Sequence, residues 1–210
     1  MEELECPPYF NDLERRVWQF AVAAHGEQRR KYNHEPYVRH VERVAQTVME
    51  YGGTTGMVMA ALLHDVLEDT PVTETEMQAF LEEVCAGTIV KPTEVLQMVL
   101  DLTDQFTKEH APGHNRKRRK QLEVERQGQI SGRAQTIKLA DILDNTRDII
   151  AQDISFAKVY IPEMVGLLEV LKSAEPFRLY LLACYEVQNA LFRLEEERRN
   201  KAQKDDVIDS

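Results

Sequence analysis

Apolar residues recur at helical spacing along almost the whole chain. The first stripe, after Pro7 and Pro8, holds Leu13, Val17, Phe20, Ala21 and Ala24. Further apolar segments of the same period predict helices over residues 38–48, 54–69, 73–84, 92–100, 135–150, 155–173 and 176–199, and a basic helix is predicted to follow residues 104–115. Residues 104–115 contain Pro112 and Gly113 and are predicted to form a loop.

Capping residues mark where several of these helices begin and end. Pro36 can open the second helix, and Gly52-Gly53 end it. Thr54 or Thr55 can cap the third, which is predicted to run without a break through Asp69. The sequence TETE at residues 73–76 forms a capping box.

The order of the elements indicates one all-α domain, because no pair of strands with hairpin chemistry interrupts the helices. Residues 1–10 form an N-terminal extension, and residues 11–200 form the helical domain. Residues 201–210 form a charged tail.

Composition narrows the range of partners. The 210 residues are 43% hydrophobic and 30% charged, with a net charge of −10, which argues against sequence-independent binding to polymeric nucleic acid or an anionic membrane. The acidic N-terminus lacks the apolar core of a signal peptide, and no apolar stretch is long enough to span a membrane. Three widely spaced cysteines are typical of a reduced, cytoplasmic protein. The oligomeric state stays open.

The segment AALLHDVLED, residues 60–69, places four ionisable groups on an apolar helix. Glu68 follows His64 by four residues, and Asp69 follows Asp65 by four, so each pair is predicted to stack one turn apart. A metal ion held by His64 and Asp65 would then lie close to two further carboxylates. Alternatively, His64 is a hydrogen-bonded core histidine and the acids form a solvated helix end. Burying an unpaired aspartate is costly, which adds weight to the metal site but leaves both alternatives open.

Further metal ligands are available on two other predicted helices. His40 lies on the inward stripe of the second helix, where it could also be a core histidine. The segment IKLADILDN places Lys138, Asp141 and Asn145 on one face of a largely buried helix. Two histidines and two aspartates form a mixed nitrogen and oxygen site that suits Mn, Fe or Zn, and the ligand types do not choose among them.

The order His40, His64-Asp65, Asp141 resembles the HD superfamily of metal-dependent phosphohydrolases. Within it, the closer resemblance is to the hydrolase domain of the RelA/SpoT type, especially stand-alone small alarmone hydrolases such as the metazoan SpoT homologues. The segments that carry this resemblance are AAHGEQRRKYNHEPYVRH, AALLHDVLEDT, LTD and IKLADILDNTRD, within residues 20–150.

The resemblance implies an HD-type helical fold in which His40, His64, Asp65 and Asp141 bind one Mn²⁺. It implies that Glu68 and Asp69 activate or position the attacking water. Arg30, Lys31 and Asn145 would help to hold the nucleotide. Independently of the resemblance, Lys138 could contact phosphate or pair with Asp141 or a glutamate. The implied reaction removes pyrophosphate from the 3′ position of ppGpp or pppGpp, which leaves GDP or GTP.

Departures from the family pattern lie in the nucleotide pocket. Ile142 stands where a basic residue is frequent, and Asp144 where His or Tyr is frequent. Because of these departures, three other enzymatic functions stay open: a (p)ppApp hydrolase, a phosphatase acting on NADPH or another nucleotide, and a dNTPase or 5′-nucleotidase. A catalytically inactive HD module that binds a partner is the alternative of another class.

Two further features border the predicted site. The run RKRRK at residues 116–120 is either a solvated helix face or a lip that attracts an anionic substrate. Tyr32 and Tyr37 could line the pocket, although Tyr37 is equally suited to packing.

Overall fold

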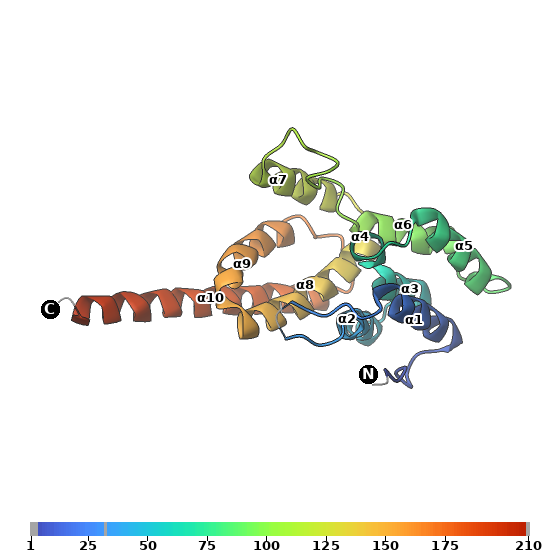
Figure 1. The fold of residues 1–210 in the computed structure, drawn as a ribbon, viewed down its shortest axis with the longest axis horizontal. Helices are drawn as coiled ribbons and strands as arrows, with labels where there is room; N and C mark the ends of the chain where they lie inside the picture. The colour runs from blue at the N-terminus through green and yellow to red at the C-terminus, as the bar shows by residue number, and fades with distance from the viewer. Residues whose placement is uncertain (1–3, 32, 209–210) are drawn as a thin grey trace.

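The computed structural model describes residues 4–31 and 33–208, and side chains as far as residue 200; this part of the chain is helical and contains no strand (Figure 1). The elements in order are α1 (Asp12–His25), α2 (Val38–Glu50), α3 (Thr55–Leu63), α4 (Val66–Asp69), α5 (Glu74–Cys85), α6 (Pro92–Leu102), α7 (Arg116–Gln127), α8 (Gly132–Gln152), α9 (Ile154–Leu168) and α10 (Phe177–Ile208). The predicted all-α fold is confirmed.

Side-chain caps fix several helix starts as the sequence predicted. The Thr54 hydroxyl accepts a hydrogen bond from the backbone N–H of Met57 at the start of α3. Thr73 and Glu76 form the expected capping box of α5. A second capping box, between Asn11 and Glu14, begins α1 and was not predicted. Each cap satisfies backbone donors that the first turn of a helix leaves unpaired.

Helix α8 joins two hydrophobic cores. The first core takes residues from α1 to α6 and includes Ile137 and Ala140 of α8. The second core contains Leu139, Ile142 and Leu143 of the same helix together with residues of α9 and α10. Asp141 therefore lies on the helix at the junction of the two cores, where packing on both sides fixes the helix.

The expectation of one unbroken helix through residues 54–69 is wrong. The chain forms α3 and α4, separated by a turn at His64 and Asp65. Asp65 has φ −99° and ψ −5°, outside the helical minimum. Adjacent side chains on a regular helix point about 100° apart, whereas this turn allows His64 and Asp65 to face the same point.

Helix α7 and the C-terminal part of α10 extend away from the other helices in Figure 1. The basic helix α7 lies apart from α1 to α3, after the long loop that the sequence predicted. Helix α10 continues past the predicted end at residue 199 to Ile208, and its C-terminal part projects beyond the other helices. Within the described part of the chain, no helix is both long and apolar enough to cross a membrane.

Candidate metal centre

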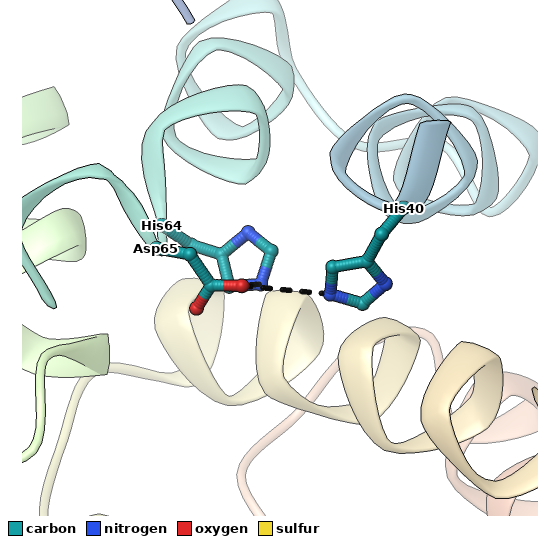
Figure 2. Close-up of side chains that lie close together, drawn as sticks. All are labelled: His40, His64 and Asp65. Carbon is teal, nitrogen blue, oxygen red and sulfur yellow. Dashed lines mark ion pairs between the residues drawn. The ribbon is translucent and has the colours of Figure 1, made fainter. Parts of the chain in front are cut away.

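Four side chains from three parts of the fold converge on one point. His40 comes from α2, His64 and Asp65 from the turn after α3, and Asp141 from α8. Figure 2 shows His40 facing His64 and Asp65 across this point. Oδ2 of Asp65 lies 3.2 Å from Nε2 of His64 and 3.6 Å from Nε2 of His40. Oδ1 of Asp141 lies 3.7 Å from Nε2 of His64 and 3.3 Å from Nε2 of His40.

Hydrogen bonds on the far sides of the two imidazoles fix their orientation. Nδ1 of His64 lies 2.8 Å from the carbonyl oxygen of Ala61, which can only accept, so this nitrogen carries a proton. Nδ1 of His40 lies 2.7 Å from Oδ2 of Asp144. In both rings Nε2 is therefore turned toward the cluster.

These Nε2 atoms are buried and have no hydrogen-bond partner in the described part of the chain. A buried polar nitrogen without a partner is costly, and a cation between the two rings and the two carboxylates would satisfy both. One ligand atom each from His40, His64 and Asp65 lie within 4.8 Å of one another, which suits a shared ion. The chain therefore presents a site for a divalent metal ion.

The negative charges of the cluster also favour a bound cation. Burial alone would lower the pKa of His40, but the carboxylates of Asp141, Asp144 and Asp65 outweigh burial and raise it to about 9. Burial alone would raise the pKa of Asp141, yet Lys138 and the two histidines hold it well below its usual range. Both aspartates stay ionised near neutral pH, so a metal ion would displace a proton from imidazole.

A second layer of charged side chains supports His40. Asp144 accepts hydrogen bonds from His40 and, at 2.6 Å from its Oδ1, from Nε of Arg43. Arg43 also donates two hydrogen bonds to the carboxylate of Glu35. Carboxylates that hold a ligating histidine fix its ring and increase its basicity. The sequence had marked Asp144 only as a departure from the family pattern, and it gave no signal for Arg43 or Glu35.

We expect Asp144→Asn to weaken metal binding by about 10- to 100-fold, as loss of such a supporting carboxylate typically does. Titration calorimetry with Mn²⁺ measures this directly. Asp12→Asn is the control, because Asp12 is exposed in the first turn of α1 and is not part of this network. Equal affinity in the Asp144→Asn and wild-type proteins would contradict the supporting role.

A cavity of about 380 Å³ opens beside the cluster. The cations and amide that line it are Arg30, Lys31, Arg116, Lys120, Lys138 and Asn145. Asp65, Asp141, Glu68, Asp104 and Glu163 supply its acidic groups, and Tyr37, Phe156 and Tyr160 its aromatic rings. This combination of cations, rings and a metal site suits an anionic ligand that carries an aromatic group.

Glu68 lines this cavity, but Asp69 does not. The backbone N–H of Asp104 donates a hydrogen bond to Glu68. The surrounding protein and the nearby charge of Asp104 raise the pKa of Glu68 to about 7, although the backbone hydrogen bond lowers it. Asp69 instead accepts a hydrogen bond of 3.0 Å from Gln28. The structure thus separates two acids that the sequence had treated as a pair.

Arg30 and Asn145 connect the cavity to Asp141. The Arg30 guanidinium donates to Oδ1 of Asn145 at 2.8 Å and pairs with Asp148 at 3.0 Å. Nδ2 of Asn145 in turn donates to Oδ1 of Asp141. Nζ of Lys138 lies 2.9 Å from the other oxygen of Asp141, which was one of its predicted partners. Lys31 lies over the ring of Phe156, 5.6 Å from its centroid.

The remaining predicted pocket residues divide between the cavity and the surface. Tyr37 donates a hydrogen bond of 2.6 Å to Oδ2 of Asp65 and so both lines the cavity and orients a ligand. Tyr32 lies outside the described residues. In the basic run, Arg116 pairs with Glu163, and Lys120 lies 3.2 Å from Asp104. These two residues line the cavity, one helical turn apart.

Comparisons with known proteins agree with this geometry. A family model described as HD domain matches residues 17–160. The chain is 38% identical over 135 residues to guanosine-3′,5′-bis(diphosphate) 3′-pyrophosphohydrolase MESH1 of Drosophila melanogaster, and the alignment covers 62% of this chain and 66% of that protein. The Homo sapiens protein of the same name is 36% identical over 133 residues, covering 62% and 65%. The chain thus spans about two thirds of the length of these curated relatives.

A solved structure also superposes on most of the fold. It is that of a metazoan ortholog of SpoT that hydrolyzes ppGpp, with a TM-score of 0.69 and 27% identity over 87% of this chain and 98% of that one. A structure from Listeria monocytogenes EGD-e has a TM-score of 0.58 at 20% identity over 79% of this chain, which supports the fold alone.

Proposed function

Because the chain belongs to the HD domain family, we propose that it is a metal-dependent hydrolase of guanosine alarmones. It removes the 3′-pyrophosphate of ppGpp or pppGpp, which leaves GDP or GTP. The observation that carries the proposal is the convergence of His40, His64, Asp65 and Asp141 at the edge of a cavity lined by cations. The names of the relatives, including MESH1, supply the substrate class.

In this proposal His40, His64, Asp65 and Asp141 hold one Mn²⁺. Bound there, the ion would polarise a phosphoryl oxygen and lower the pKa of water. Glu68 faces the same cavity and accepts the proton of the attacking water, for which a carboxyl pKa near 7 is suited. We assign Asp69 an indirect role on the same short helix, through its bond to Gln28.

The side chains around the cavity position the nucleotide. Lys31 and Phe156 offer a cation and a ring to the base or to phosphate. Arg30 and Asn145 hold Asp141 in place and present polar groups to the cavity, while Lys138 neutralises charge near the reacting phosphoryl group. Water attacks the phosphorus attached to the 3′ oxygen, and its proton passes to Glu68. The bond between that phosphorus and the 3′ oxygen breaks, and the proton returns from Glu68 to the 3′ oxygen, which leaves as a hydroxyl.

The proposal places the protein in the cytoplasm, where its three cysteines, free in the structure, would stay reduced. Its partner is a small nucleotide rather than polymeric nucleic acid or membrane, as the net charge of −10 favours.

A panel of substrates tests the proposal. The purified chain is incubated with Mn²⁺ and, separately, with ppGpp, pppGpp, ppApp, NADPH and dGTP, and kcat/KM is measured for each. We expect the highest values for ppGpp and pppGpp. A preference for ppApp, activity on NADPH or dGTP alone, or no hydrolysis with any of them would each overturn the guanosine alarmone assignment.

The pKa of Glu68 gives a second prediction. A base must be ionised, so activity is present above the pKa of Glu68 and falls as the pH drops through about 7. Asp104→Asn removes the negative charge that raises this pKa but keeps the backbone donor. We therefore expect the acidic limb of the profile of kcat/KM against pH to move to lower pH. A profile shifted upward or left in place would contradict the role given to Glu68.

The basic helix gives a third prediction. Arg116→Gln removes a cation that lines the cavity, and we expect KM to rise several-fold with little change in kcat, most strongly at low ionic strength. Arg118→Gln is the matched control, since Arg118 pairs with Glu125 on its own helix. Equal KM values for the two variants would leave α7 as a solvated helix face.

A further inference from the structure

Helix α10 carries an apolar stripe on the side that faces away from the fold. Phe177, Leu181, Tyr185 and Phe192 are between 52% and 64% exposed. They make up four of the seven large hydrophobic side chains that are exposed in the described part of the chain. Their spacing of four, four and seven residues places them on one helical face. We call this set the outer stripe.

The opposite side of α10 is fully used by the fold. Leu179, Ala183, Val187, Ala190 and Leu194 are buried in the second core, against α8 and α9. On a helix of 3.6 residues per turn these positions lie across the axis from the outer stripe. The stripe is therefore not a poorly packed margin of the core but a second apolar face, whose burial would remove four large side chains from water.

The spacing continues along the helix as a seam. Residues 181, 185, 188, 192, 195 and 199 follow one another at alternating intervals of four and three. This is the spacing by which two helices pack side by side. Gln188 is the polar residue within its apolar part, and Glu195 and Arg199 extend it into the projecting end of the helix.

Charges at the two ends of the stripe fit a second copy that runs in the opposite direction. If Leu181 faces Phe192 of the second copy, each step toward the N-terminus on one helix is matched by a step toward the C-terminus on the other. Arg178 then faces Glu195 of the second copy, and Glu175 faces Arg198. A parallel pair would instead bring Arg178 against Arg178 and Glu195 against Glu195, which is unfavourable. The stripe is self-complementary only in the antiparallel direction.

The projecting end of α10 is exposed in a single copy and would be stabilised by packing against a second one. Residues 195–200 are all exposed, and Figure 1 shows this part of the helix beyond the other elements. A helical segment of this length is marginal in water without packing. In the antiparallel pair it passes the start of the second copy's α10, where each copy has a groove of about 1160 Å³. Arg133 and Lys172 line that groove together with Glu94 and Glu175, so it presents both signs of charge to the segment EEERRN of residues 195–200.

From the stripe, the seam, the charges and the groove, we propose that α10 is the contact surface of a homodimer. The two α10 helices pack antiparallel along their outer stripes, with the two-fold axis between residues 186 and 187. The occupant of the stripe is thus a second copy of this chain, and the symmetric contact closes on itself as a dimer.

The mass of the full chain in solution tests the proposal. Light scattering after gel filtration is expected to give twice the 24.3 kDa of one chain. Leu181→Glu places a charge in the seam and should halve that mass, whereas Val159→Glu, at an exposed apolar position on α9, should leave it unchanged. A monomeric wild-type chain, or a dimer that Leu181→Glu leaves intact, would overturn the assignment.

Charge exchange keeps the test valid if Leu181→Glu misfolds. Arg178→Glu and Glu195→Arg should each weaken the dimer, and the double variant should restore it, because opposite charges again face each other. Failure of the double variant to recover the dimer would contradict this register.

Cross-linking tests the direction of the helices. In a Cys184→Ser background, the Leu181→Cys, Phe192→Cys double variant should form an intermolecular disulfide, and Leu181→Cys alone should not. Self-linking by the single variant would indicate parallel helices and overturn the antiparallel arrangement.

Discussion

Asp65→Ala is expected to abolish both metal binding and hydrolysis. Asp65 contributes a carboxylate oxygen 3.2 Å from Nε2 of His64 and 3.6 Å from Nε2 of His40, so its loss removes the anion between the two imidazoles. A bound metal lowers the pKa of water from about 15.7 to about 7. We therefore expect kcat/KM to fall by more than about 10³-fold once the ion is lost.

Two measurements separate this effect from a folding defect. Titration calorimetry with Mn²⁺ should detect no binding to Asp65→Ala, while the circular dichroism spectrum stays helical. Asp12→Ala, at an exposed position in the first turn of α1, is the control and should bind metal normally. If Asp65→Ala bound Mn²⁺ with unchanged affinity, Asp65 would not be a ligand.

Glu68→Gln is expected to have the second largest effect, and of a different kind. The amide keeps the shape of the side chain and its bond to the Asp104 backbone N–H, but it cannot take a proton from water. Loss of a general base typically costs about 10²- to 10⁴-fold, and we expect kcat to fall within that range. Because Glu68 is not among the converging ligands, affinity for Mn²⁺ should change little.

The control for this variant is Glu74→Gln, an exposed acid at the start of α5. It should retain wild-type kcat. The acidic limb of the pH profile should also disappear in Glu68→Gln, since the group that titrates is gone. Full turnover in Glu68→Gln would remove Glu68 from the mechanism.

The features that could be predicted from the sequence depend on residues that are close together in the chain. Helix starts were predictable because a cap such as Thr73 with Glu76 acts within one turn. The face of α8 that holds Lys138, Asp141 and Asn145 was predictable from the helical period alone. The converging ligands could be proposed because a buried aspartate needs a cation.

The missed features depend on contacts between distant segments. The break between α3 and α4 follows directly after α3, in which almost every residue is apolar, so periodicity carries no signal for where that helix ends. Asp144, Arg43 and Glu35 were missed because a polar residue on a helix does not indicate which other helix it faces. Asp148 continues the Asn145 face by one turn, but its partner Arg30 is 118 residues away in sequence.

We propose that the side chains around the convergent cluster of His40, His64, Asp65 and Asp141 direct water to the phosphorus on the 3′ oxygen of a guanosine alarmone. Hydrolysis of ppGpp with Mn²⁺ in ¹⁸O-labelled water, followed by mass spectrometry, tests this most directly. We predict equal amounts of GDP and pyrophosphate, with the label in the pyrophosphate. Release of orthophosphate, or loss of phosphate from the 5′ position, would contradict it.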